Sequence, residues 1–314
     1  MTTIITSDPA EAAEHARRGL PVAFPTETVY GLGAPVSDVA GIRRIYEAKE
    51  RPPTNPLIVH VADQGDISNI AAEVSITAQL LIEAFFPGPL TLVLPKHQSV
   101  SDVVSAGLST VGVRMPDHPI ALRFIEAVGE AVAAPSANRS GRPSPTSWAA
   151  VKDDLDGRIA CILKGDRTRT GLESTVLDCT GDEAVILRPG SVTLEMLRSV
   201  VPDVRLSHGG EEIKQRSPGT RFRHYAPRAD VVIVDSPPAA PGLNSAFIGM
   251  SEPTDPRPYA YILVCDSVAD YARDLFNFFR ECEGLGVERI FCQAVARDGI
   301  GLALMDRIDR AAAR

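Results

Sequence analysis

The chain has 314 residues, which at about 150 residues per domain suggests two domains. Apolar residues make up 44% and charged residues 23%, an ordinary globular composition that excludes collagen, a coiled coil and intrinsic disorder. The net charge of −8 argues against a broad basic face for nucleic acid. No apolar run reaches the roughly 18 residues of a membrane helix and no secretory signal is visible, so we expect a cytoplasmic protein without a membrane partner.

The five cysteines indicate a reducing compartment. Cys161, Cys179, Cys265, Cys282 and Cys292 are odd in number, widely spaced and contain no C-x-x-C pair. This pattern favours neither a disulfide framework nor a zinc site. We expect them to be small buried side chains.

Charge is uneven along the chain and predicts the domain boundaries. Residues 1–210 carry 19 Lys and Arg against 25 Asp and Glu, and residues 230–314 carry 8 against 13. Residues 211–229 carry 5 against 2 and contain Pro218 and Pro227. We therefore predict two acidic domains, 1–210 and 230–314, joined by an extended basic linker at 211–229.

Short apolar runs alternate with helical patterns in the first domain. The predicted strands lie at 22–24, 57–61, 90–94, 110–114, 131–134, 159–163, 175–178 and 184–188. Predicted helices include 38–49, which Ser37 can cap, and 119–128. The alternation predicts an α/β domain with a mixed sheet.

The second domain also alternates strands and helices. Its predicted strands lie at 231–235, 246–250, 261–265 and 290–295, and its predicted helices at 275–282 and 302–312. Strands that are apolar throughout are typical of a parallel sheet, so we predict a small Rossmann-like domain.

Several familiar catalytic motifs are absent from the sequence. There is no G-x-x-x-x-G-K-[ST], H-E-x-x-H or G-x-S-x-G. Gly31-x-Gly33 and Gly299-x-Gly301 both lack the third glycine of a dinucleotide fingerprint. Nucleotide chemistry in this chain would need another kind of site.

Two early segments combine polar side chains with turn residues. PTETVYGLG at 25–33 leaves a strand and enters a glycine-containing turn, where N–H groups and hydroxyls could face a ligand. In KERPPTNP at 49–56 the prolines end the preceding helix by about Arg51. Lys49 and Arg51 then either offset the helix dipole or bind an anion such as a phosphate chain.

Two strands carry unexpected polar residues on one face. His60 shares a face with Ile58 in an apolar run, where it is either a core residue or a ligand contact. In the strand at 110–114, Thr110, Gly112 and Arg114 share a face. A hydroxyl, a bare backbone and a guanidinium suit a carboxylate or phosphate, although a solvated strand face is the alternative.

The strand ends that follow are also polar. AAPSANRSGRPS at 133–144, LEST at 172–175 and LRPG at 187–190 place hydroxyls, amides and arginines where α/β proteins hold ligands. Because no acid and base are paired, these residues indicate anion binding and positioning and disfavour a hydrolytic triad.

These motifs together resemble the YrdC-like family of L-threonylcarbamoyladenylate synthases. PTETVYGLG, the K-x-R at 49–51 with NPLIVHV, the S-x-N at 136–138, LESTV and LRPG carry the resemblance. SPGTRFRHYAP, followed by a small second domain, is similar to the long two-domain form of the family. The resemblance implies a twisted mixed sheet with a concave ligand face, followed by a small Rossmann-like parallel domain.

The resemblance also implies an activity. L-threonine, bicarbonate or CO2, and ATP with Mg²⁺ would give threonylcarbamoyl-AMP and pyrophosphate, which makes the chain a nucleotidyltransferase. The product would supply the t6A modification at position 37 of tRNAs that read ANN codons. A downstream threonylcarbamoyl-transferase machinery would perform the transfer, and direct tRNA contact would not be required.

Site residues follow from the resemblance, position by position. The implied ATP site comprises Arg51, Asn55, Thr110, Ser136, Ser144, Arg188 and Tyr225. The implied threonine site comprises Thr28, His60, Arg114, the backbone of Ala134, and Ser174. Lys49 and Asn138 complete the K-x-R and S-x-N signatures and would join Arg51 and Ser136 in catalysis. Mg²⁺ would be carried by ATP, with no metal site of the protein's own.

The sequence also predicts a role for the linker and leaves two alternative functions open. We predict that residues 217–227 close over the nucleotide as a lid, because the mixed anhydride is sensitive to water. A factor that grips double-stranded RNA is the main alternative, against which the acidic first domain counts. A domain that handles carbamoyl-AMP is a third reading.

Overall fold

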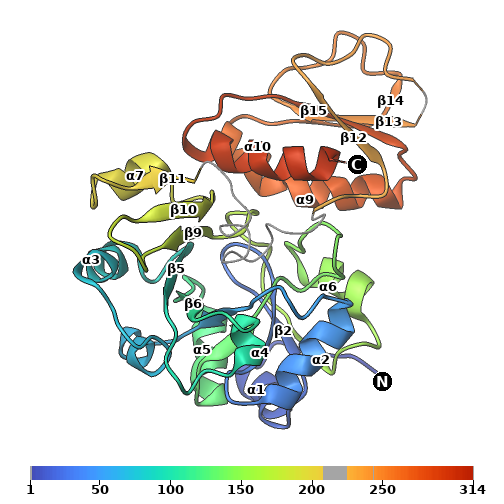
Figure 1. Ribbon diagram of the computed structural model, residues 1–314. Coiled ribbons are helices and arrows are strands. Elements are labelled where there is room, and N and C mark those ends of the chain that lie inside the picture. Colours follow the sequence, from blue (N-terminus) through green and yellow to red (C-terminus); the bar gives the residue numbers. More distant parts are fainter. Residues whose placement is uncertain (1, 208–224, 243, 314) are drawn as a thin grey trace.

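The computed structural model describes residues 2–207, 225–242 and 244–313. They form an 11-stranded mixed sheet and a four-stranded parallel sheet, which confirms the predicted two-part α/β fold (Figure 1). Residues 211–224 of the predicted linker, which include 217–224 of the predicted lid, lie outside the described residues, so the domain bounds stay predictions. In the part of the chain that is described, no helix is both long and apolar enough to cross a bilayer.

The N-terminal domain contains the large sheet and its helices. In chain order its elements are β1 (Ile4–Thr6), α1 (Pro9–Arg17), β2 (Val22–Phe24), β3 (Gly31–Pro35), α2 (Val39–Lys49), β4 (Ile58–His60), the 3-10 helix η1 (Gln64–Asn69), α3 (Ile76–Phe85), β5 (Leu90–Pro95), α4 (Asp102–Ser105), β6 (Thr110–Arg114), α5 (Pro119–Val128), β7 (Val132–Ala134), α6 (Trp148–Leu155), β8 (Cys161–Leu163), β9 (Thr175–Asp178), β10 (Val185–Arg188), α7 (Leu194–Arg198) and β11 (Arg205–Leu206). Each of the predicted strands is present.

The strand order of the large sheet is β1-β8-β2-β3-β7-β4-β6-β5-β9-β10-β11. Alternate side chains of β2 enter different cores. Val22 and Phe24 pack with α1 and α5, whereas Ala23 between them joins the larger core with α2 and α3. At β2 the two faces of the sheet are thus covered by different helices.

Strand β3 replaces a predicted turn. The glycines at 31 and 33 suggested a tight turn, but Gly31–Pro35 pairs antiparallel with β2 and β7. A Cβ at Gly33 would lie 2.4 Å from Val132 Cγ1 and 2.8 Å from the Phe24 ring. The glycine therefore makes room for its neighbours' side chains on a strand.

Helix α2 begins one residue later than predicted. Asp38, not Ser37, caps it by accepting a hydrogen bond from the Gly41 N–H at 2.9 Å. The Ser37 hydroxyl instead donates to Glu130 at 2.7 Å. The helix ends where predicted, because Glu50 adopts a left-handed conformation with φ 54°.

The C-terminal domain holds a parallel sheet, as predicted, and its strand order is β12-β15-β13-β14. Its elements are β12 (Asp230–Val234), β13 (Ser245–Gly249), β14 (Tyr259–Val264), α9 (Val268–Gly284), β15 (Arg289–Gln293) and α10 (Gly299–Ala312). Helix α9 starts earlier than predicted because Ser267 caps it through the Asp270 N–H. The Rossmann-like detail stays a prediction.

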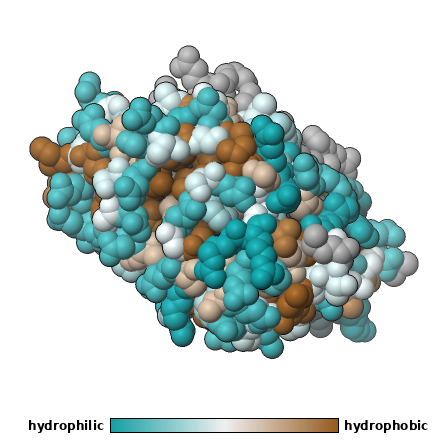
Figure 2. Space-filling model, turned by 90° about the horizontal axis from the view of Figure 1, so that it is seen from below, coloured by the Kyte–Doolittle hydropathy of each residue, from teal (hydrophilic) through white to brown (hydrophobic). Residues whose placement is uncertain are grey.

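Helices α9 and α10 lie between the small sheet and the N-terminal domain (Figure 1). Seen from below, hydrophobic residues form separate patches among hydrophilic ones (Figure 2). Such scattered patches are usual on a folded domain.

The five cysteines are buried and unpaired, as predicted.

Candidate active site

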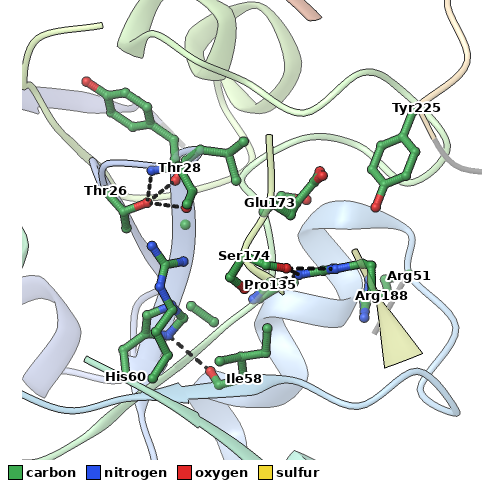
Figure 3. Close-up of a pocket in the computed structure, with 16 residues that line it drawn as sticks. Thr26, Thr28, Arg51, Ile58, His60, Pro135, Glu173, Ser174, Arg188 and Tyr225 are labelled. Atoms are coloured by element: carbon green, nitrogen blue, oxygen red, sulfur yellow. Dashed lines mark hydrogen bonds between the residues drawn. The ribbon is translucent and has the colours of Figure 1, made fainter. Parts of the chain in front are cut away.

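A cavity in the N-terminal domain collects most of the predicted site residues. Those that line it are Thr28, Arg51, His60, Arg114, Ala134, Ser136, Ser174, Arg188 and Tyr225. Figure 3 shows Thr26 and Thr28 on one side, Arg51 and Tyr225 on the other, and Glu173 and Ser174 between them. The volume of this cavity is about 60 Å³.

The loop after β2 forms the threonine-rich side of the cavity. Its conformation is set by Thr26, whose hydroxyl donates to the Val29 carbonyl at 2.6 Å and accepts from the Thr28 N–H at 3.2 Å. The Thr26 and Thr28 hydroxyl oxygens lie 2.9 Å apart. Both side chains are buried, and this wall offers hydroxyl groups to the cavity.

The floor is formed by β4 and β6, which pair in parallel so that His60 lies opposite Arg114. His60 Nδ1 lies 3.1 Å from the Ile58 carbonyl, and its ring meets Phe24 edge-on. Burial, assisted by Arg114, lowers the pKa of His60 to about 3. The imidazole is therefore neutral near neutral pH.

Arg114 is held from behind by two partners. Its Nε donates to the Gly88 carbonyl at 3.2 Å, and its Nη2 lies 2.6 Å from Glu27 Oε1. Arg114 and Glu27 are both buried, at 4% and 3% exposure. Glu27 is absent from the predicted site, although its place inside the PTETVYGLG motif was a usable signal.

Lys49 lies behind the cavity and does not line it. Its ammonium donates to the carbonyls of Ser136, at 2.6 Å, and Asn138. Burial, reinforced by Arg51, keeps the pKa of Lys49 well below its usual range. Lys49 therefore fixes the loop at 136–138 and does not project toward an anion.

Arg51 does reach the cavity. Its Nε and Nη2 donate to the carbonyls of Asn55 and Pro56 at 3.3 and 3.0 Å. Burial lowers the pKa of Arg51 to about 10, so the guanidinium stays charged at neutral pH. The end of the PPTNP loop thus presents two backbone carbonyls that orient this cation.

The loop after β7 is tied by its own side chains. The Ser136 hydroxyl donates to Asn138 Oδ1 at 2.5 Å, and Asn138 Nδ2 donates to the carbonyls of Arg139 and Arg142 at 2.8 and 2.9 Å. Ser136 lines the cavity while Asn138 supports it from outside. The S-x-N signature therefore combines one wall residue with one loop-forming residue.

The next part of the wall comes from Arg188 of β10 and from the segment before β9. Arg188 donates to the Ser174 carbonyl from Nη2 at 2.9 Å and to the Ser174 hydroxyl at 3.2 Å. Ser174 Oγ also lies 2.8 Å from Thr91 Oγ1. Glu173, another residue absent from the predicted site, accepts from the Ser144 hydroxyl at 2.5 Å.

Five predicted residues lie outside the cavity wall: Lys49, Asn55, Thr110, Asn138 and Ser144. Thr110 starts β6 and is half-buried, while Val111 and Val113 face the core. The predicted separation of the two faces of this strand is confirmed. Asn55 and Ser144 contact wall residues: the Asn55 carbonyl accepts a hydrogen bond from Arg51, and the Ser144 hydroxyl donates one to Glu173.

The charges of the wall favour an anionic ligand. Arg51, Arg114 and Arg188 are all buried beside the cavity, and Glu173 is the one carboxylate among the described residues that line it. Buried guanidiniums bind carboxylate and phosphate groups strongly. Within the ranges that the structure describes, no group of three or more His, Cys, Asp or Glu could hold a metal ion.

Comparison with known proteins identifies the family. A family model described as "Telomere recombination" matches residues 14–190, and one described as "Threonylcarbamoyl-AMP synthase, C-terminal domain" matches residues 192–313. The threonylcarbamoyl-AMP synthase of Pyrococcus abyssi is 43% identical over 96% of this chain and 92% of its own length. That of Bacillus subtilis is 40% identical over 98% and 94%.

A solved structure agrees with these matches. A crystal structure of P. abyssi Sua5 complexed with L-threonine superposes with a TM-score of 0.91 at 41% identity, covering 99% of this chain and 97% of that one. The matches span both domains and nearly the full length of each relative. The chain therefore belongs to the threonylcarbamoyl-AMP synthase family, in its two-domain form.

Proposed function

We propose that the chain joins L-threonine, bicarbonate or CO2, and ATP to give threonylcarbamoyl-AMP and pyrophosphate. It would thus be a nucleotidyltransferase that supplies the intermediate for t6A at position 37 of tRNAs reading ANN codons. Other proteins would transfer the threonylcarbamoyl group, and tRNA need not touch this chain. The observation that carries the proposal is the convergence of Arg51, Arg114 and Arg188 on one buried cavity.

The cavity divides into two halves in this proposal. Thr28, His60, Arg114, the Ala134 backbone and Ser174 would hold threonine. Arg51, Ser136, Arg188 and Tyr225 would hold ATP, with Asn55, Thr110 and Ser144 supporting or flanking them. The amino-acid half is supported by the relatives named as threonylcarbamoyl-AMP synthases and by the complex of P. abyssi Sua5 with L-threonine.

The proposed reaction suits a site that positions its substrates and neutralises the charge of the phosphates. A carbamate oxygen attacks the α-phosphorus while pyrophosphate leaves, and little covalent work falls to the protein. Arg51 and Arg188 would offset the phosphate charge. Mg²⁺ would arrive on the triphosphate, whose oxygens are its preferred ligands, because the wall itself offers mainly cations and hydroxyls.

His60 would orient threonine without acting as a base. A group with a pKa near 3 holds a proton poorly at neutral pH, so it cannot drive deprotonation of an ammonium. Lys49 would act through the loop that it anchors, because its ammonium is already occupied by two carbonyls.

The two alternatives receive less support from the same residues. An RNA-binding face needs exposed cations, whereas Arg51, Arg114 and Arg188 are at most 8% exposed. The full-length relatives that are named make threonylcarbamoyl-AMP, which disfavours carbamoyl-AMP handling. The test is pyrophosphate release with threonine, bicarbonate and ATP, each omitted in turn; release that ignores threonine would refute the proposal.

A further inference from the structure

The segments that carry the cavity wall are anchored in the C-terminal domain. Val29, next to Thr28, and Leu172, next to Glu173, belong to the same apolar cluster as Tyr271 and Phe276 of α9. Just before Leu172, Gly171 has φ +78°, and a Cβ there would lie 2.2 Å from the Arg273 carbonyl oxygen. The backbone that leads into Glu173 thus rests directly on α9.

Arg307 of α10 extends this anchoring to a charged group. It is fully buried, and its neighbours on that helix face, Leu304 and Ala311, are buried apolar residues. Its Nε donates to Glu173 Oε2 at 2.8 Å, and its guanidinium carbon lies 5.3 Å from the centroid of the Tyr225 ring. Glu173 and Tyr225 are both wall residues of the cavity.

Building on the proposed function, we propose that Arg307 is a positioning residue through which the C-terminal domain completes the active site. It holds the Glu173 carboxylate and the Tyr225 ring in place on the cavity wall. Glu173 in turn fixes the segment that carries Ser174, and Tyr225 faces the proposed nucleotide half. The C-terminal domain then contributes a residue that positions the wall of the active site.

The charge state of Glu173 follows from its surroundings. Burial favours the neutral acid, but Arg307 of α10, Arg188 of β10 and the Ser144 hydroxyl outweigh it and lower the pKa of Glu173. Tyr225 faces the same carboxylate, and Asp306 pairs with Arg307 at 2.6 Å from the other side. Removing Arg307 would take away a positive charge that stabilises the Glu173 carboxylate while the carboxylate stays buried, so the pKa of Glu173 should rise.

The test uses the full chain with Arg307→Met, Glu173→Gln and the double variant, assayed by pyrophosphate release across about pH 6 to 9. Arg307→Met should lower kcat/KM at least about tenfold at neutral pH and recover part of it at alkaline pH. Adding Glu173→Gln to Arg307→Met should abolish the recovery at alkaline pH, because no carboxylate is left to ionise. The double variant should be no worse than the poorer single variant by more than about threefold, because both act through one contact.

Two further variants separate positioning from folding. Arg297→Met, at an exposed arginine just before α10 that pairs with Asp309, should leave activity and pH profile unchanged. Arg307→Lys keeps the charge; it should keep the wild-type pH profile while lowering kcat, which applies even where Arg307→Met fails to fold.

Two results would overturn the inference. One is an Arg307→Met protein with wild-type kcat, KM and pH profile; the other is losses that multiply in the double variant. The proposed function itself fails separately, if the wild-type chain releases no threonine-dependent pyrophosphate.

Discussion

Replacing Arg114 by lysine probes the amino-acid half of the site. Gly88 and Glu27 hold Nε and Nη2 of the guanidinium, at 3.2 and 2.6 Å, and so fix how it faces the cavity. Lysine keeps a positive charge beside Glu27. It therefore avoids a buried unpaired carboxylate, which would destabilise the fold by about 3–5 kcal/mol.

The expected size of the effect follows from the lost contact. A hydrogen bond to a charged group contributes about 1.5–3 kcal/mol, and each 1.4 kcal/mol is about a factor of ten. The KM for threonine should therefore rise about 10- to 150-fold. Because Arg51 and Arg188 face the proposed phosphate side, the affinity for ATP should change by less than about threefold.

The assay is pyrophosphate release against threonine concentration with ATP and bicarbonate saturating, and ATP binding by calorimetry. Arg205→Lys is the matched control, because that side chain is exposed and pairs with the exposed Glu183. An unchanged KM for threonine, or an equal loss of ATP affinity, would show that the division of the cavity is wrong.

Three other predictions follow from particular contacts. Arg188→Lys should raise the KM for ATP more than that for threonine, by about tenfold, since lysine lacks the planar guanidinium that would bind a phosphate through two N–H groups; steady-state kinetics decides this, and a larger threonine effect would contradict it. His60 has a folded pKa of about 3 against 6.5 when exposed, so the unfolded chain takes up the extra proton and stability falls as pH drops below about 6.5. Urea unfolding should show wild type losing about 2 kcal/mol more than His60→Gln on moving from neutral pH to about pH 5, and equal losses would exclude this linkage. Gly33→Ala should destabilise the fold by about 1–3 kcal/mol, because its Cβ meets Val132 and Phe24. Gly284→Ala, where a Cβ meets nothing within 4 Å, is the control, and equal unfolding midpoints would contradict the packing argument.

The strands were predictable because their apolar runs are continuous and bounded by turn residues. The faces of β6 could also be assigned, since Val111 and Val113 alternate with Thr110, Gly112 and Arg114. The turn predicted at Gly31 and Gly33 was wrong, because a glycine can serve either a turn or the close packing of a strand. Only the neighbouring Phe24 and Val132 side chains decide between them, and they come from other strands.

The candidate site was predictable where polar residues follow strands. Supporting residues were harder to predict, because their partners are distant in sequence. Lys49 meets the loop at 136–138, and Arg307 meets Glu173 across 134 residues. An arginine within the apolar stripe of α10 was the available signal for Arg307, but the sequence did not indicate which carboxylate it would meet.

We propose above all that one cavity holds an amino acid and a nucleotide close enough to be joined. The most direct measurement is the formation of threonylcarbamoyl-AMP and pyrophosphate by the purified full chain, with labelled threonine, bicarbonate and ATP. We expect the two products in equal amounts, and omitting any one substrate should abolish both. Pyrophosphate formed without threonine, or labelled threonine never recovered attached to AMP, would contradict it.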